Sequence, residues 1–225
     1  MAPALWGALL FDCIQMTQIQ LNTLTRAQLR QSLRQQRRAL TTQQQHLASL
    51  RLMRTLKREA LFIRAKRIGF YLASDGEISP LPLIKLALKM GKQCFLPVLH
   101  PVRHNRLWFA RYKPGSRLVK NRYSIAEPDI RLEPRVLPQT LDLVLLPLVG
   151  FDLQGGRLGM GGGYYDRTFA FTRRANQQDR RPPRRSPALV GLAHELQQQN
   201  TLELADWDIP LAAVATECQL YWSLT

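Results

Sequence analysis

Residues 155–167 read Gly155-Gly156-Arg157-Leu158-Gly159-Met160-Gly161-Gly162-Gly163-Tyr164-Tyr165-Asp166-Arg167 and hold six of the 13 glycines in the chain. They follow an apolar run, residues 141–151, whose composition is typical of a buried strand. Glycines let a backbone approach an anion closely and turn several N–H groups onto it, because no Cβ blocks the approach. A strand, a glycine loop and a polar helix start, in this order, indicate phosphate binding. The stretch therefore predicts an anion site at the end of a strand in an α/β fold.

The spacing of these glycines differs from that of the two common nucleotide loops. A dinucleotide-binding fingerprint starting at Gly159 needs glycine at position 164, where the chain has tyrosine. No Gly-Lys-Ser/Thr follows to make a P-loop. A flexible surface turn is the alternative interpretation of the same residues.

Short apolar runs alternate with helical patterns on both sides of this loop. One helix is expected after a Thr25 N-cap, a second at Thr42, where Thr42-x-x-Gln45 forms a capping box, and a third over residues 81–90. Strands are expected over residues 68–73, 93–99, 107–112, 141–151, 188–194 and 212–217. This alternation is typical of βαβ units. We therefore expect a single three-layer α/β/α domain, with helices on both faces of a mostly parallel, Rossmann-like sheet.

Ligands of open α/β sheets bind beyond the carboxyl ends of the strands. The acidic turn Ser74-Asp75-Gly76-Glu77 and the glycine loop each follow an expected strand, so we expect both to face one cleft. In the first helix Arg26, Arg30 and Arg34 recur every four residues and share one face. Such a face can grip phosphate oxygens, although for Arg34 we favour simple solvation.

The composition is that of one cytoplasmic globular domain. A chain of 225 residues, 45% of them hydrophobic, is long enough to bury a substantial core. Its three cysteines lie far apart without metal or redox spacing, which favours a reducing compartment. The apolar stretch 3–14 is too short to span a bilayer, so we expect no membrane association. We expect residues 1–24 to form an N-terminal extension of unknown function and residues 25–225 a single catalytic domain.

The formal net charge of +16 is high enough that nucleic-acid binding must be considered. Residues 26–67 alone hold 12 Lys and Arg against one acidic residue, Glu59. No RNA-recognition signature, zinc module or aromatic-interleaved strand accompanies this charge. We therefore expect no specific nucleic-acid partner. A basic RNA-associated protein without enzymatic activity is the alternative function.

Several motifs together resemble those of the 5-formyltetrahydrofolate cyclo-ligase family, whose members are also called 5,10-methenyltetrahydrofolate synthetases. The glycine loop with its Tyr-Tyr-Asp ending is the specific part, and the resemblance runs from residue 25 to residue 216. The supporting motifs are Arg26-x-x-Leu29-Arg30, Arg37-Arg38-Ala39-Leu40 and residues 70–78, 96–99, 125–128, 141–152 and 207–210.

The resemblance implies an enzyme that uses ATP and Mg²⁺ to convert 5-formyltetrahydrofolate into 5,10-methenyltetrahydrofolate, ADP and phosphate. In the implied mechanism the formyl oxygen attacks the γ-phosphate, N10 closes the ring and phosphate leaves. No protein nucleophile is needed, so the protein supplies alignment and charge neutralisation. The implied partner is the folate, with or without a polyglutamate tail, and we expect a monomer.

The resemblance also assigns candidate site residues. The implied catalytic set is Arg157, Tyr164 and Arg30. The implied ATP-binding residues are Arg26, Arg30, Arg157, Leu158, Gly159, Met160, Gly161, Gly162, Gly163, Tyr164 and Tyr165. The implied substrate-binding residues are Leu72, Glu77, Met160, Gly161, Gly162, Gly163 and Tyr164, and the implied metal ligand is Asp166.

Each assignment has a structural alternative. Asp166 is a magnesium ligand or the N-cap of the following helix, and the two functions are compatible. Of the two tyrosines we expect one to be functional and one structural, with Tyr164 the better functional candidate. Glu77 is otherwise an exposed turn carboxylate, and Leu72 is otherwise a core residue.

The chain departs from the pattern of some family members. They carry basic residues at the positions of Met160 and Gly162, so neutralisation of the triphosphate falls here to Arg157, Arg167 or Arg30. A second magnesium aspartate of some members corresponds here to Ala212, with Asp208 as a weaker substitute. The catalytic alternative is a sugar-phosphate isomerase or CoA-transferase on a related sheet, which needs an acid/base carboxylate but no ATP.

Overall fold

The computed structural model describes residues 25–174, 186–203 and 205–223, so the extension expected for residues 1–24 lies outside the described residues. Its centre is an eight-stranded sheet of order β12-β11-β10-β7-β1-β2-β3-β6. The strands from β11 to β2 run parallel, whereas β12, β3 and β6 pair antiparallel at the two edges. The α/β class with a mostly parallel sheet is thereby confirmed. The strands are β1 (Arg67–Gly69), β2 (Gln93–Leu99), β3 (Leu107–Tyr112), β6 (Arg135–Val136), β7 (Leu143–Pro147), β10 (Ala188–Leu192), β11 (Ala213–Ala215) and β12 (Leu220–Trp222).

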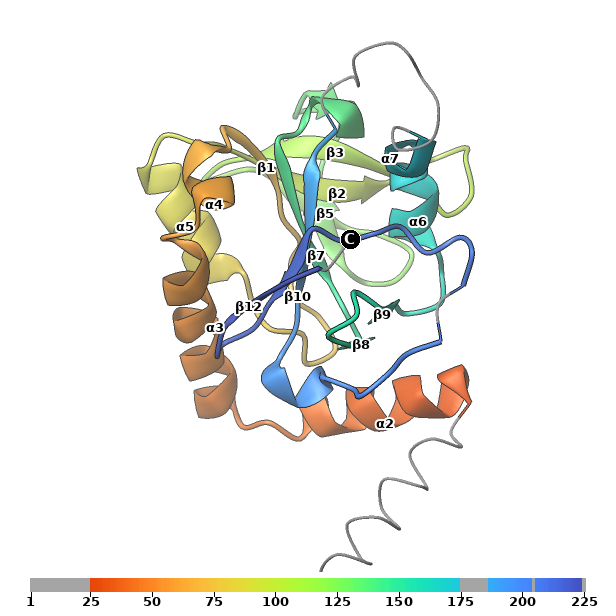
Figure 1. The fold of residues 1–225 in the computed structure, drawn as a ribbon. Helices are drawn as coiled ribbons and strands as arrows, with labels where there is room; N and C mark the ends of the chain where they lie inside the picture. Colours follow the sequence, from red (N-terminus) through yellow and green to blue (C-terminus); the bar gives the residue numbers. More distant parts are fainter. Residues whose placement is uncertain (1–24, 175–185, 204, 224–225) are drawn as a thin grey trace, which may run out of the picture.

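Helices cover both faces of this sheet (Figure 1). In that view α3, α4 and α5 lie on one side of the sheet and α6 and α7 on the other, while α2 crosses below β8 and β9. The helices are α2 (Arg26–Arg38), α3 (Thr42–Leu56), α4 (Ala60–Arg64), α5 (Leu81–Lys89), α6 (Tyr164–Phe169) and α7 (Phe171–Arg174), with short 3₁₀ turns η1 (Pro138–Thr140) and η2 (Glu195–Gln197). Among the described residues, no helix has the length and apolar character needed to cross a membrane.

The central strand β7 shows why helices are needed on both faces. Leu143 and Leu145 pack into the hydrophobic cluster that contains the residues of α3 and α5. Val144 and Leu146 point the other way and share a cluster with Phe169 of α6. Successive side chains of a strand alternate between faces, so a continuous apolar run is stable only when both faces are covered.

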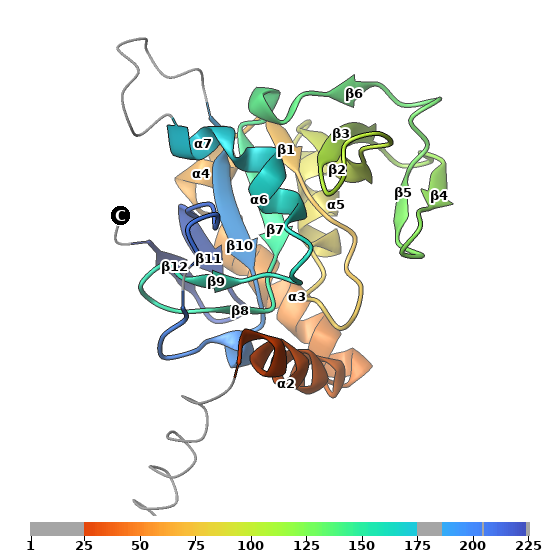
Figure 2. The same cartoon turned by 90° about the vertical axis from the view of Figure 1, so that its right-hand side faces the viewer.

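Two small antiparallel sheets stand outside the main one. The first pairs β4 (Leu118–Lys120) with β5 (Ala126–Pro128), and the second pairs β8 (Gly150–Phe151) with β9 (Arg157–Leu158). Figure 2 shows the β4–β5 hairpin projecting beside β2 and β3, and β8 and β9 running above α2. These strands have two or three residues each, too few to give a periodic signal in the sequence.

The expected strand over residues 141–151 was wrong in its second half. β7 ends at Pro147, which has no N–H to donate to the ladder, and Gly150–Phe151 pairs with β9 instead. The expected strand over residues 68–73 is also shorter, because β1 ends at Gly69. The chain after each strand is therefore irregular, and these irregular segments build the site.

The expected start of the second helix at Thr42 is confirmed, but its capping box lies one residue earlier. Thr41 is the N-cap: its side chain accepts the Gln44 N–H at 3.2 Å, and the Gln44 side chain accepts the Thr41 N–H at 2.8 Å. Thr41 and Thr42 are each followed three residues later by a glutamine. The Thr-x-x-Gln pattern of a capping box therefore fits with either threonine as the N-cap.

Candidate functional site

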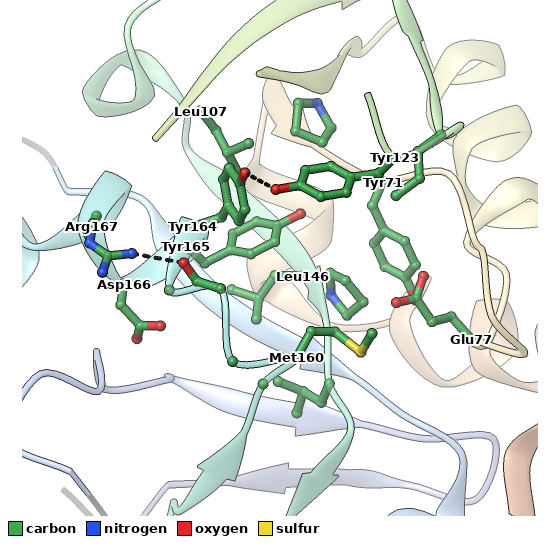
Figure 3. A pocket seen from close by; sticks show the side chains of 18 of the residues that line it. Tyr71, Glu77, Leu107, Tyr123, Leu146, Met160, Tyr164, Tyr165, Asp166 and Arg167 are labelled. Carbon is green, nitrogen blue, oxygen red and sulfur yellow. Dashed lines mark hydrogen bonds between the residues drawn. The ribbon is translucent and has the colours of Figure 1, made fainter. Parts of the chain in front are cut away.

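A cavity of about 1500 Å³ lies where α2, the acidic turn, the end of β7, the glycine loop and the β4–β5 hairpin meet. Figure 3 shows Tyr71 and Glu77 on one side of it and Asp166 and Arg167 on the other. With one exception, every candidate residue from the sequence lines this cavity. The exception is Leu158, whose side chain is buried in a cluster with Leu33, Val149 and Leu202.

The glycine loop connects β9 to α6 in a conformation that needs glycine at two positions. Gly161 has φ +91° and Gly163, the N-cap of α6, has φ +64°. Arginine side chains bind two carbonyls of the loop: Arg30 Nε donates to Gly159 O at 2.8 Å and Arg167 Nη1 donates to Gly162 O at 2.7 Å. The N–H groups of residues 160–163 donate to none of the described residues. The loop thus offers free donors next to fixed guanidinium groups, the arrangement that an anion needs.

Asp166 lies in the first turn of α6 and is not its N-cap, so that part of the expectation was wrong. Gly163 occupies the cap because only a left-handed residue joins the loop to the helix here. The Asp166 carboxylate accepts a hydrogen bond from the buried Arg157 through Oδ1, and the Ile209 N–H donates to the same oxygen at 3.2 Å. Asp166 therefore fixes the guanidinium of Arg157 beside the loop.

The acidic turn is held against α2 by one carboxylate. Asp75 has φ +54° and accepts hydrogen bonds from Arg34, Arg37 and Arg38. Burial opposes ionisation of Asp75, but the hydrogen bonds from the three guanidinium groups outweigh it and lower the pKa of this carboxyl to about 2. The solvation expected for Arg34 was wrong, because its Nε lies 2.7 Å from the Asp75 Oδ2.

Glu77, at the end of this turn, is not an exposed carboxylate. Its side chain is 8% exposed and lines the cavity. Its Oε2 accepts the Ser74 N–H at 3.0 Å, and its Oε1 lies 3.8 Å from Arg37 Nη2. Burial raises the pKa of Glu77, while the bond from Ser74 and the charge of Arg37 oppose the rise.

The two tyrosines of the loop have different surroundings. Tyr165 stacks on Phe169 of α6, with ring centroids 6.4 Å apart, and burial raises the pKa of its hydroxyl. Tyr164 turns towards the β4–β5 hairpin, where its hydroxyl lies 2.7 Å from that of Tyr123 and accepts from Arg122 at 2.6 Å. Figure 3 shows the Tyr123–Tyr164 bond over the cavity. Tyr164 is therefore joined to a second segment of the cavity wall, whereas Tyr165 packs against its own helix.

Several cavity residues were missed by the sequence analysis. Arg37 lies behind the cavity wall and is fully buried, and arginine on a helix gives no sequence signal of burial. Tyr71 is also buried, and its hydroxyl donates to Ile78 O at 2.6 Å. Tyr123 and Arg106 come from segments outside the expected site. For the hairpin, the sequence offered the motif at residues 125–128 but no strand signal.

Two carboxylates near the loop, those of Asp166 and Asp208, are candidate metal ligands. In the part of the chain that the structure describes, no group of three or more His, Cys, Asp or Glu side chains is arranged to hold a metal ion. Asp208 is engaged by the Ala205 N–H at 3.0 Å and by Arg26 at 3.4 Å. Oδ2 of Asp166 accepts no hydrogen bond from the described residues. Mg²⁺ commonly binds through one or two carboxylates plus phosphate oxygens and water, and the donors here fit that mode.

Comparisons with known proteins point in one direction. The profile described as "5-formyltetrahydrofolate cyclo-ligase family" matches residues 22–217. A 5-formyltetrahydrofolate cyclo-ligase of Escherichia coli K12 is 38% identical, over 84% of this chain and 98% of the relative. That of Haemophilus influenzae is 40% identical, over 85% of this chain and 97% of the relative. The NMR structure of Aquifex aeolicus 5,10-methenyltetrahydrofolate synthetase superposes with a TM-score of 0.73 at 28% identity, covering 90% of this chain and 94% of that one.

Proposed function

The chain belongs to the 5-formyltetrahydrofolate cyclo-ligase family, and we propose that the cavity between its glycine loop and its acidic turn is the active site. The protein is an enzyme that converts 5-formyltetrahydrofolate to 5,10-methenyltetrahydrofolate, and the family implies the use of ATP. One observation carries the assignment of the site: free loop N–H groups and a buried carboxylate, Glu77, line a single cavity.

The glycine loop is the proposed binding site of the triphosphate. Arg30 and Arg167 bind loop carbonyls and bring positive charge beside it, and Arg157, bound to Asp166, adds a third guanidinium to the cavity wall. Neutralisation of this kind is the main contribution a protein makes to phosphoryl transfer. The proposed nucleotide-binding residues are Arg26, Arg30, Arg157, Leu158, Gly159, Met160, Gly161, Gly162, Gly163, Tyr164 and Tyr165, with Leu158 contributing backbone only.

Asp166 is the proposed protein ligand of a Mg²⁺ ion that enters with ATP. The ion supplies charge neutralisation of the phosphate oxygens when bound. One carboxylate oxygen of Asp166 is bound by Arg157 and the Ile209 N–H, which leaves the other for the ion or its water shell. Asp208 forms its bonds to Arg26 and Ala205, and we assign it to the structure of the neighbouring loop.

The folate is proposed to lie between the acidic turn and the loop. Glu77 accepts N–H groups of the pterin, Leu72 packs against its ring, and residues 160–164 cover it from the loop side. The formyl oxygen attacks the γ-phosphate, N10 closes the ring and phosphate leaves, so no side chain acts as nucleophile. Arg157, Tyr164 and Arg30 align the reacting groups and stabilise the charge of the phosphoryl group. Such a site accelerates the reaction mainly by this alignment and charge stabilisation.

The remaining parts of the assignment are also proposals. We propose a cytoplasmic monomer without a specific nucleic-acid or membrane partner, in which residues 25–225 form the catalytic domain. A polyglutamate tail on the folate is compatible with the net charge of +16. Tight RNA binding at physiological salt would support the alternative function, that of an RNA-associated protein.

The experiment mixes the purified chain with 5-formyltetrahydrofolate and Mg²⁺ and follows the absorbance of the methenyl product with and without ATP. We expect product only with ATP. Asp166→Asn should raise the Mg²⁺ concentration for half-maximal rate about tenfold, because a carboxylate ligand becomes a neutral amide. The matched control is Glu59→Gln, whose side chain makes no cap hydrogen bond and lies outside the cavity. An unchanged Mg²⁺ dependence in Asp166→Asn would overturn the metal assignment.

A further inference from the structure

Six arginines line the cavity, and five of them belong to α2 or to the glycine loop. Arg26, Arg30 and Arg34 come from α2, and Arg157 and Arg167 flank the glycine loop. Each of these five is bound to a carboxylate or a backbone carbonyl. The sixth, Arg106, comes from a different part of the chain, the turn between β2 and β3.

The backbone around Arg106 is fixed although its side chain is exposed. The His100 N–H donates to Arg106 O at 3.0 Å, and the next N–H, that of Leu107, donates to the buried Thr168 Oγ1 at 2.8 Å. The guanidinium of Arg106 makes no hydrogen bond or ion pair with the residues described by the structure. The backbone of Arg106 is thus fixed at the wall of the cavity, while its guanidinium has no partner among the described residues.

The surroundings of Arg106 contain further positive charge. Burial and the charges of Arg103, Arg106 and Arg135 lower the pKa of His100, so these three cations gather around that ring. Arg135 itself lies over the Trp108 ring, 4.2 Å from its centroid. Arg106 forms no ion pair within 4.0 Å among the described residues, although Glu127 also lines the cavity, so its guanidinium can still receive a ligand carboxylate.

The wall next to Arg106 is mostly apolar, and its one carboxylate among the described lining residues, Glu127, accepts hydrogen bonds from the Leu99 N–H at 3.1 Å and from Asn121 Nδ2 at 3.0 Å. Leu99, Leu107, Tyr123 and Ile125 line the cavity between this turn and the hairpin. In Figure 3 Leu107 and Glu77 lie apart, on opposite sides of Tyr165. A ligand that places a polar ring at Glu77 and extends across the cavity therefore meets apolar side chains first and a cation afterwards.

The three parts of 5-formyltetrahydrofolate occur in the same order as these features of the cavity wall. A pterin carries the N–H groups, an apolar aminobenzoyl ring follows, and a glutamate with two carboxylates forms the tail. We propose that Arg106 binds a carboxylate of this glutamate and so selects the glutamate-bearing folate, an inference that rests on the function proposed above. A guanidinium matches a carboxylate with two parallel hydrogen bonds, and both groups are charged.

The first test is Arg106→Gln, which keeps the length of the stem but removes the charge. The KM for 5-formyltetrahydrofolate should rise about 10- to 100-fold, as for loss of a charge-assisted hydrogen bond, while kcat and the KM for ATP stay within about twofold. Arg103→Gln is the matched control, because it lies in the same turn but does not line the cavity. A rise in the KM for ATP, or an equal effect of both substitutions, would overturn the proposal.

The second test changes the substrate and separates binding from folding. In 5-formyltetrahydropteroate the glutamate is missing, so the wild-type protein should bind it as weakly as Arg106→Gln binds the full folate. Arg106→Gln should then show no further loss with the pteroate. Equal losses from the substitution with both substrates would mean that Arg106 acts on structure and not on the tail. Failure of the wild type to convert either compound would reject the proposed function instead.

Discussion

Arg37 and Asp75 form a partly buried ion pair that joins α2 to the acidic turn. The Arg37 side chain is fully buried, with Nη2 2.8 Å from the Asp75 Oδ2 and Nε 2.8 Å from the Asp75 backbone oxygen. A third bond runs from Nη1 to Leu148 O at 3.0 Å. One side chain therefore connects the first helix, the turn that carries Glu77 and the chain just beyond β7.

Substitution Arg37→Met should lower the free energy of unfolding by about 3 kcal/mol, the lower end for removing one partner of a buried pair. The lower end applies because Arg34 and Arg38 remain beside Asp75. Urea unfolding measures the change. Arg38→Ala is the control: its side chain is 53% exposed, so its loss should stay below about 1 kcal/mol. Similar losses in both variants would contradict the central position of Arg37.

The pH dependence of stability should report Asp75. Its pKa of about 2 in the folded protein lies below the ordinary value of 3.8. The ionised carboxylate therefore stabilises the fold above about pH 4, and this contribution is lost as the pH falls towards 2. Between pH 5 and pH 2 the free energy of unfolding of the wild type should fall more steeply than that of Asp75→Asn. Parallel pH profiles for the two proteins would contradict the prediction.

Glu77 should control the affinity for the folate. Glu77→Gln should weaken the binding of 5-formyltetrahydrofolate about tenfold, since a charged acceptor becomes a neutral one, and leave the binding of ATP unchanged. Burial raises the pKa of Glu77 above its ordinary 4.5, so the wild type should lose folate affinity as the pH falls from 7 towards that value. Titration calorimetry across this range checks both points. The pH dependence should disappear in Glu77→Gln, and its persistence would point to another group.

Gly163 should be needed for the shape of the loop. A Cβ on Gly163, at φ +64°, would lie 2.7 Å from Arg167 Nη1, so Gly163→Ala displaces the guanidinium from Gly162 O. The KM for ATP should rise about tenfold, as for a lost charged hydrogen bond, and stability should fall by about 1 kcal/mol. Gly115→Ala is the control, because φ is +84° there and the added Cβ meets open space. It should lose similar stability without a change in the KM for ATP.

The sequence predicted best what depends on neighbouring residues. Residues 93–99 and 107–112 form β2 and β3 with the expected bounds, because each is a mostly apolar run between polar turns. The glycine loop was located because a dense run of glycines directly after an apolar strand marks backbone that needs positive φ or close approach to a ligand. Both features are local, and local patterns are what a single sequence displays.

The sequence did not predict features that depend on distant partners. Arg37 meets Asp75 across 38 positions of the chain, and nothing in α2 distinguishes a buried arginine from its exposed neighbours. The approach of Tyr123 to Tyr164 likewise depends on how the hairpin packs beside β2 and β3. The break at Pro147 was missed because the residues around it are as apolar as those of the strand. The candidate site could thus be placed, but its supporting contacts could not.

Phosphorylation of the formyl oxygen in this cavity can be tested by ¹⁸O labelling. The protein would turn over 5-formyltetrahydrofolate labelled with ¹⁸O in the formyl group, together with unlabelled MgATP, and the released phosphate would be analysed by mass spectrometry. We expect one ¹⁸O atom in each phosphate formed. Unlabelled phosphate, with the label recovered in water, would contradict it.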